Sequence, residues 1–198
     1  MTRSLTVLVL VAALASGCDP GARVPSTLLT LEDIHAAPVA PAALRSAPEG
    51  AEAVGPDPDP RGPCGASVPP FPVADAAVAV FERPDVTVVH AVADGAPGLV
   101  DAVRSDLAPG CASFTKASVA GDQETELVGS LDPGPSAAVG YVWRTVVGDA
   151  PPAFVAHVLI EGRDGAVAGV WVFADTMPVR PFVTALAVRA DELLDASP

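Results

Sequence analysis

The chain has 198 residues, half of them hydrophobic, and carries a formal net charge of −13 at pH 7. This length is sufficient for one domain with a substantial core, even after an N-terminal leader is set aside. Because like charges repel, so acidic a composition argues against binding to nucleic acid and against attraction to anionic lipid headgroups.

The first eighteen residues have the pattern of a secretory leader that ends in a lipid-attachment cysteine. Arg3 supplies a basic start, an apolar run extends over residues 5–14, and Ala-Ser-Gly precedes Cys18. This run is too short to span a bilayer, which requires about twenty residues. We therefore expect residues 1–17 to be a signal peptide and Cys18 to accept a diacylglycerol. The alternative is an ordinary cleaved signal peptide in which Cys18 has no special role.

The mature protein would then be a tethered, strongly acidic body. Removing residues 1–17 takes away one base, Arg3, so the formal charge becomes −14. Two acyl chains are enough to anchor a protein stably without a basic patch. We expect residues 18–25 to form the tether, and residues 26–196 to form one domain on the extracytoplasmic side of the cell membrane.

Cysteine usage agrees with export. If Cys18 is acylated, Cys64 and Cys111 remain as one pair in an oxidising compartment. We predict a disulfide between them, which in the chain-entropy treatment is worth about 4 kcal/mol. The alternative is two free, buried thiols.

The N-terminal part of the domain begins with a short helical signal and continues into a loop. Thr30 is a candidate N-cap for a helix that starts at Leu31, with Asp33 at the third helical position of a capping box. Pro38 ends this helix. Residues 38–63 are rich in Pro, Ala and Gly and are predicted to be a loop within the domain.

Alternating and β-branched residues predict six strands, and two longer segments have helical periodicity. The strands are expected at 74–81, 86–92, 124–131, 138–147, 154–161 and 166–173. The helices are expected at 96–107 and 178–196. The sequence therefore predicts an α+β domain, with a single, mainly antiparallel sheet of about five to six strands packed against helices.

A register for the last three strands divides their side chains between two faces. We place Val147 opposite Phe154 and Arg163 opposite Ala166, with a tight turn at Asp164-Gly165. One face is then aromatic-rich and should be covered by the two longer helices. It carries Tyr141, Trp143, Phe154, Val158, Ile160, Val167, Trp171 and Phe173. The other face is largely aliphatic, so either the loop at 38–63 or another element should cover it, or it forms a groove for a ligand or a partner.

Arg144, His157 and Glu161 are the candidate ligand-binding residues, because this register places them near the middle of the aliphatic face. They could hold an anionic or polar group in a groove. The alternative is a surface ion pair between Arg144 and Glu161, worth under about 1 kcal/mol, beside a half-buried His157. A metal site would need a third ligand, and neither His35 nor His90 is placed near these residues.

Two further groups have both a functional and a structural interpretation. Asp122, Glu124 and Glu126 could bind calcium, but a solvated edge strand is the favoured interpretation. Trp143 and Trp171 could line a ligand cleft, but their spacing favours the core.

The order of elements resembles a known family. A cysteine at the acylation position precedes LLTLEDI, and a Pro-rich stretch leads to PCGAS. The passage VFERPDVTVVHAVADGAPGLVDAVRSDLAPGCASF then supplies strand, helix and cysteine, and VWVFADTMPVRPFVTALAVRADELL supplies the final strand and closing helix. Over most of 26–196 this order resembles actinobacterial sensor-domain lipoproteins, whose domain also forms the extracellular part of the PknH-type receptor kinases. Members typically have four cysteines in two disulfides, whereas this chain offers one pair.

The resemblance implies an α+β domain with a large cleft, no established catalysis and an unidentified ligand. The residues themselves contain no Gly-x-Ser-x-Gly, His-Glu-x-x-His, phosphate-loop or Cys-x-x-Cys motif. We therefore expect a non-enzymatic ligand-binding or sensing lipoprotein without a cofactor. The alternatives are a cell-envelope protein-interaction module and a hydrolase that lacks a recognisable motif.

Overall fold

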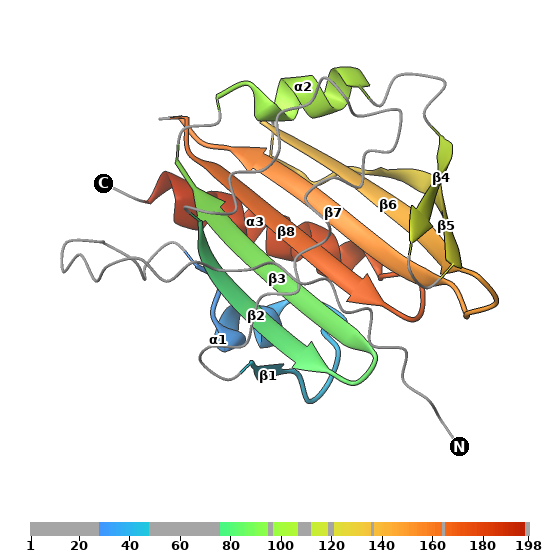
Figure 1. Ribbon diagram of the computed structural model, residues 1–198. Coiled ribbons are helices and arrows are strands. Elements are labelled where there is room, and N and C mark those ends of the chain that lie inside the picture. The colour runs from blue at the N-terminus through green and yellow to red at the C-terminus, as the bar shows by residue number, and fades with distance from the viewer. Residues whose placement is uncertain are drawn as a thin grey trace, which may run out of the picture.

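The computed structural model describes residues 28–47, 76–94, 97–106, 112–118, 121–135, 137–163 and 165–196 (Figure 1). The leader at 1–17, the tether at 18–25 and most of the Pro-rich loop lie outside these residues, as do Cys18, Cys64 and Cys111. The lipid attachment and the disulfide therefore stay predictions.

Within the described residues, three helices and eight strands form one α+β unit. They are α1 (Leu31–Ala36), β1 (Arg45–Ser46), β2 (Ala77–Arg83), β3 (Val86–Ala93), α2 (Leu99–Asp106), β4 (Ser113–Ser118), β5 (Gly121–Leu131), β6 (Ala138–Val147), β7 (Ala153–Glu161), β8 (Val167–Ala174) and α3 (Arg180–Asp195). The strands make a single antiparallel sheet in the order β1-β2-β3-β8-β7-β6-β5-β4. The α+β class and the antiparallel sheet are confirmed, but the expected five to six strands are too few. The two unpredicted strands are β1, which has only two residues, and β4, which is largely polar.

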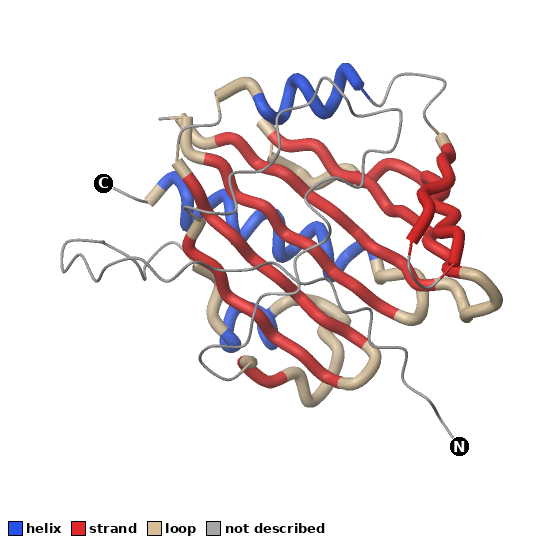
Figure 2. Tube along the Cα trace, in the orientation of Figure 1, coloured by secondary structure: helices blue, strands red, loops and turns tan. Residues whose placement is uncertain are grey.

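The helices lie on both faces of the sheet. Figures 1 and 2 show α3 and α1 behind the sheet, whereas α2 lies at one end of the other face. On the α3 side, Phe182, Leu186 and Ala190 share a buried cluster with Val158 and Val170. The sequence placed the two longer helices over the aromatic-rich face; this is wrong for α3, which covers the opposite, aliphatic one.

The predicted register of β7 is also wrong, because β7 is turned over relative to both neighbours. Phe154 lies opposite Arg144 rather than Val147, and the β7–β8 hairpin closes at Gly162 and Ala166 rather than at Arg163 and Ala166. Each difference is an odd number of residues, so each exchanges the two faces of β7. The β7–β8 register differs because Gly162 donates its N–H to the Ala166 carbonyl at 2.8 Å. The turn is therefore one residue longer than the Asp-Gly signal predicts.

Because β7 is turned over, both faces of the sheet carry other residues than the sequence predicts. Four β7 residues join the tryptophan face, namely Val155, His157, Leu159 and Glu161, while Phe154, Ala156, Val158 and Ile160 join the α3 face. Val142, Val170 and Val172, which the sequence placed on the aliphatic face that needs a cover, are at most 2 % exposed in the core under α3, so another element of the fold covers them.

The short helix α1 has the capping box that the sequence predicts. The Thr30 hydroxyl accepts the Asp33 N–H at 3.2 Å, and the Asp33 carboxylate accepts the Thr30 N–H at 2.8 Å. A helix of six residues is too short to be stable alone. Contacts to the rest of the domain therefore hold it: Ile34 is fully buried, and Asp33 Oδ1 pairs with Arg189 Nε on α3 at 2.7 Å.

None of the helices in the described part of the chain is long and apolar enough to cross a bilayer.

Candidate functional site

A stacked pair of rings lies at the centre of the tryptophan face. His157 on β7 is directly opposite Trp171 on β8, and their ring centroids are 4.9 Å apart with planes inclined by 18°. Tyr141 on β6 lies on the other side of His157 in the same row. The three central strands of the sheet thus place an imidazole between an indole and a phenol.

A glycine makes room for the stack. A Cβ atom added to Gly169 would lie 2.0 Å from Cη2 of Trp171, so the indole folds back over the backbone of its own strand two residues earlier. No larger residue can occupy this position without displacing the ring, which fits the role of glycine in strands at points of close approach. Gly169 was not among the residues predicted from the sequence to matter. Its only sequence signal is its position in a predicted strand, two residues before a tryptophan.

The imidazole of His157 is held in its neutral form. Its Nε2 atom is buried and has no hydrogen-bond partner among the described residues. Burial lowers the pKa of His157 to about 4, because the charged imidazolium would lose its hydration. Nothing polar in the described protein uses Nε2, so a group brought by a ligand could form a hydrogen bond with it.

The stack lies at the border between a closed and an open part of the face. Towards α2, Leu99 and Val100 are buried in the same cluster as Trp171. Away from α2, the neighbouring row of Trp143, Val155 and Phe173 is only partly buried. A ligand could therefore contact this outer row and approach the imidazole from that side.

An aromatic side chain lies beside Trp143, and a cationic one acts on Tyr141. Phe114 on β4 meets Trp143 edge to face, with centroids 6.2 Å apart. Burial raises the pKa of the Tyr141 phenol, and the positive charge of Arg104 on α2 opposes this shift. The phenol therefore stays protonated at neutral pH.

The three sequence-predicted ligand residues are not brought together. Arg144 lies on the α3 face, opposite Phe154, and its Nη1 is 3.7 Å from the Glu126 carboxylate. His157 and Glu161 share the tryptophan face, but Glu161 accepts the N–H of Gly98 at 2.9 Å, directly before α2. Both the groove built from Arg144, His157 and Glu161 and the alternative Arg144–Glu161 ion pair are therefore wrong.

The other sequence candidates have structural placements. Trp171 is 5 % exposed, as the core interpretation predicts, whereas Trp143 is partly exposed. Glu124 and Glu126 lie on β5, which is the second strand from the edge, so they are not on an edge strand as expected. In the described part of the chain, no group of three or more His, Cys, Asp or Glu residues could hold a metal ion.

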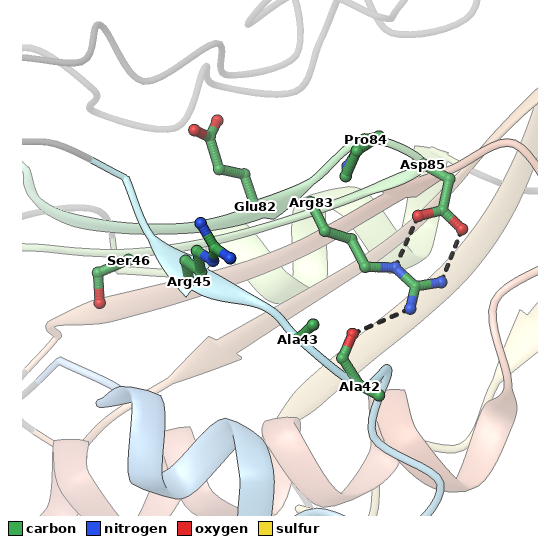
Figure 3. Close-up of a pocket in the computed structure, with 8 residues that line it drawn as sticks. All are labelled: Ala42, Ala43, Arg45, Ser46, Glu82, Arg83, Pro84 and Asp85. Carbon is green, nitrogen blue, oxygen red and sulfur yellow. Dashed lines mark hydrogen bonds and ion pairs between the residues drawn. The ribbon is translucent and has the colours of Figure 1, made fainter.

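A second feature is an open groove of about 1020 Å³ beside β1 and the β2–β3 turn (Figure 3). Arg83 is fixed there: its guanidinium contacts the Asp85 carboxylate at 2.6 Å and donates from Nη1 to the Ala42 carbonyl at 3.0 Å. Arg45 and Glu82 are opposite each other on β1 and β2, yet neither side chain has a hydrogen bond or ion pair within the described ranges. Apolar Ala42, Ala43 and Pro84 line the groove together with side chains of both charges, and no sequence pattern predicted it.

Comparison with known proteins finds no matching family, no significantly similar curated protein and no matching solved structure.

Proposed function

We propose that this chain is a membrane-anchored extracytoplasmic lipoprotein whose domain binds or senses a ligand without catalysing a reaction on it. The leader pattern and Cys18 support the location. The buried Nε2 of His157, which has no partner in the described part of the chain and lies beside a partly exposed aromatic row, is the observation that supports the binding role.

The chemistry of this face suggests the class of ligand. Trp143, Val155 and Phe173 offer an apolar, partly exposed surface to a ligand body. The neutral imidazole offers one hydrogen-bonding position, and burial there disfavours charge. We therefore propose an apolar, uncharged molecule that carries a hydroxyl, amide or carbonyl group.

The interaction-module alternative rested on a bare aliphatic sheet face. Val142, Val170 and Val172 of that face are buried beneath α3. A docking surface of that kind therefore has no counterpart among the described residues, and ligand binding remains the better supported proposal.

Native mass spectrometry of the full chain, extracted from membranes with detergent, tests the proposal. We expect a diacyl mass on Cys18, a loss of two hydrogens for Cys64–Cys111, and a co-purified apolar molecule. Replacing His157 by Leu should weaken binding of that molecule about tenfold, because one hydrogen bond is lost. Arg144→Ala, on the opposite face, is the matched control and should leave affinity unchanged.

Three results would each contradict one part of the proposed function. An unmodified Cys18 would overturn the lipid anchor. Equal affinity in the His157→Leu variant and the parent would overturn the site. Chemical conversion of the bound molecule during incubation would overturn the non-catalytic role.

A further inference from the structure

We propose that one corner of the domain, formed by the α1–β1, β2–β3 and β8–α3 connections, lies on the surface of the lipid bilayer. This inference rests on the proposed lipid anchor and adds an orientation to it. The corner consists of residues 37–44, 84–85 and 175–179, and we call it the α1 corner.

The first argument is the distribution of exposed apolar side chains. Five large hydrophobic residues are exposed in the described chain, and three belong to the α1 corner: Val39, Met177 and Val179. Val39 is 66 % exposed, more than any other of the five. Pro38, Ala42, Ala43 and Pro84 are also exposed around it. Apolar groups gathered in this way indicate a surface that meets a lipid or a partner.

The second argument is backbone strain in the same place. Val39 and Ala43 have φ values of 58° and 62°, and they are the only residues other than glycine with positive φ in the described ranges. A β-branched residue is particularly unfavourable in this region. Strain of this kind persists where surrounding contacts impose it, and such positions cluster at functional surfaces.

The third argument is that the corner is held together rather than formed by separate loops. Arg83, itself paired with Asp85, donates to the Ala42 carbonyl at 3.0 Å (Figure 3). The Asp175 N–H donates to the Asp85 carbonyl at 3.3 Å, which joins the β8–α3 connection to the β2–β3 turn. Leu44, at the end of the first loop, is 2 % exposed. The apolar side chains are therefore presented from fixed backbone.

The fourth argument is local charge. The corner and its immediate flanks carry three arginines and three carboxylates, so they are formally neutral in a protein whose mature charge is −14. These residues are Arg45, Arg83, Arg180, Glu82, Asp85 and Asp175. A region whose charges sum to zero is repelled less by phosphate headgroups than an acidic one, and arginine side chains can pair with them. Asp122 and Asp149 lie at the same end of β5 and β6, so contact requires the domain to tilt onto the α1 corner.

The tether allows this orientation. Nine residues lie between Cys18 and Leu28, so the chain makes ten Cα-to-Cα steps and can span at most about 35 Å. Leu29 is bound to His90 near the middle of β3, so the tether alone could bring either end of the sheet to the membrane. The α2 end carries exposed Asp94, Asp101 and Arg163, and only one of the five exposed hydrophobic residues, Val188, lies near it, beside Gly134 of the β5–β6 connection. The composition therefore favours the α1 corner.

Fluorescence quenching by brominated phosphatidylcholine vesicles tests the orientation on the full, lipid-bearing chain. Tryptophan is introduced as Val39→Trp or Met177→Trp, with Val128→Trp on β5 as the matched control because Val128 is 41 % exposed. The unsubstituted protein, with Trp143 and Trp171, supplies the baseline. We expect at least about a twofold loss of the added fluorescence at 39 and 177, and little loss at 128.

Three outcomes contradict the proposed orientation, and a mass measurement separates them from failure of the lipid anchor. An acyl mass on Cys18 without quenching at 39 and 177 overturns the orientation but not the lipoprotein. Equal quenching at all three positions overturns a preferred orientation, and stronger quenching at 128 overturns the choice of the α1 corner. Absence of the acyl mass overturns both proposals. The two separate variants guard against misfolding caused by a bulky residue at the strained position 39.

Discussion

The Nδ1 atom of His90 accepts a hydrogen bond of 3.0 Å from the backbone N–H of Leu29, across 61 residues of sequence. Both residues are buried, with exposed fractions of 0 % and 2 %. The bond fastens the segment that precedes α1 to strand β3. Because Nδ1 accepts, the neutral ring carries its proton on Nε2, which has no partner among the described residues.

Burial of His90 makes the free energy of unfolding depend on pH. Burial lowers the pKa of His90 to about 4, against the attraction of Asp33, so the folded state binds fewer protons than the unfolded state between pH 4 and 6.5. The stabilisation is fully present above pH 6.5 and is lost as pH falls towards 4. The difference in pKa corresponds to roughly 3 kcal/mol.

Urea unfolding at pH 7, 5.5 and 4.5 measures this effect. His90→Asn keeps an acceptor for the Leu29 N–H and removes the titration, so its unfolding free energy should fall less steeply with acid than that of the parent. His35→Asn, at an exposed position, is the matched control and should follow the parent. A His90→Asn variant with the same pH dependence as the parent would contradict the assignment.

The contact between Gly169 and Trp171 should be sensitive to one methyl group. Gly169→Ala places a Cβ where the indole ring lies, so the ring must leave His157. We expect a loss of about 1–3 kcal/mol in unfolding free energy and a rise in the pKa of His157 towards 6.5. Chemical denaturation and histidine NMR titration measure these effects. Gly129→Ala is the matched control, since its nearest described atom is at an ordinary 3.6 Å, and similar losses in both variants would refute the explanation.

Trp171 should report the protonation of His157 directly. In a Trp143→Phe variant, Trp171 is the remaining tryptophan and is stacked on the imidazole with ring centroids 4.9 Å apart. A protonated imidazole quenches a neighbouring indole, so emission should fall with a midpoint near pH 4. The reciprocal Trp171→Phe variant retains Trp143 beside Phe114 and should show no such step. A midpoint near 6.5 would show that His157 is not desolvated.

Much of this fold is local and was predictable for that reason. The capping box of Thr30 and Asp33 involves residues three apart, and amphipathic periodicity located α2 and α3 within a few residues. Trp143 and Trp171 were correctly placed on one face of the sheet. The predicted β6–β7 and β7–β8 registers are each wrong by an odd number of residues. Together the two errors turn β7 over but leave the faces of β6 and β8 correctly matched. The shared face of the two tryptophans therefore does not verify either predicted hairpin.

His157, Trp143 and Trp171 were named from the sequence, but their arrangement was not predictable, because it depends on register and close packing. Face assignment changes with a single residue of slip, and a three-residue hairpin loop is not distinguished from a two-residue turn by Asp164-Gly165 alone. The capping of α2 by Glu161 and the bond from Leu29 to His90 join residues 63 and 61 apart. Local sequence patterns contain no information on such contacts.

Arg144 distinguishes the observed register from the sequence-based one. It lies across the sheet from His157 and contacts the exposed Glu126 carboxylate at 3.7 Å. Arg144→Ala should therefore lower unfolding free energy by less than about 1 kcal/mol and leave the NMR titration of His157 unchanged. A shifted His157 titration would support the groove that the sequence suggested. Arg163→Ala, also a surface ion-pair residue, is the matched control.

Glu161 should act through the position of α2 and not through direct ligand contact. Its Oε1 accepts the N–H of Gly98, whose carbonyl in turn accepts the N–H of Ala102 in the first turn of α2. Removing the acceptor leaves a helix N-terminus without this partner, so Glu161→Ala should destabilise the domain by about 0.5–2 kcal/mol. Hydrogen exchange should quicken in 99–106 first, because α2 covers one end of the tryptophan face with Leu99 and Val100. Glu126→Ala, which removes an exposed carboxylate from β5, should leave exchange in α2 unchanged; accelerated exchange in both variants would show that Glu161 has no specific role there.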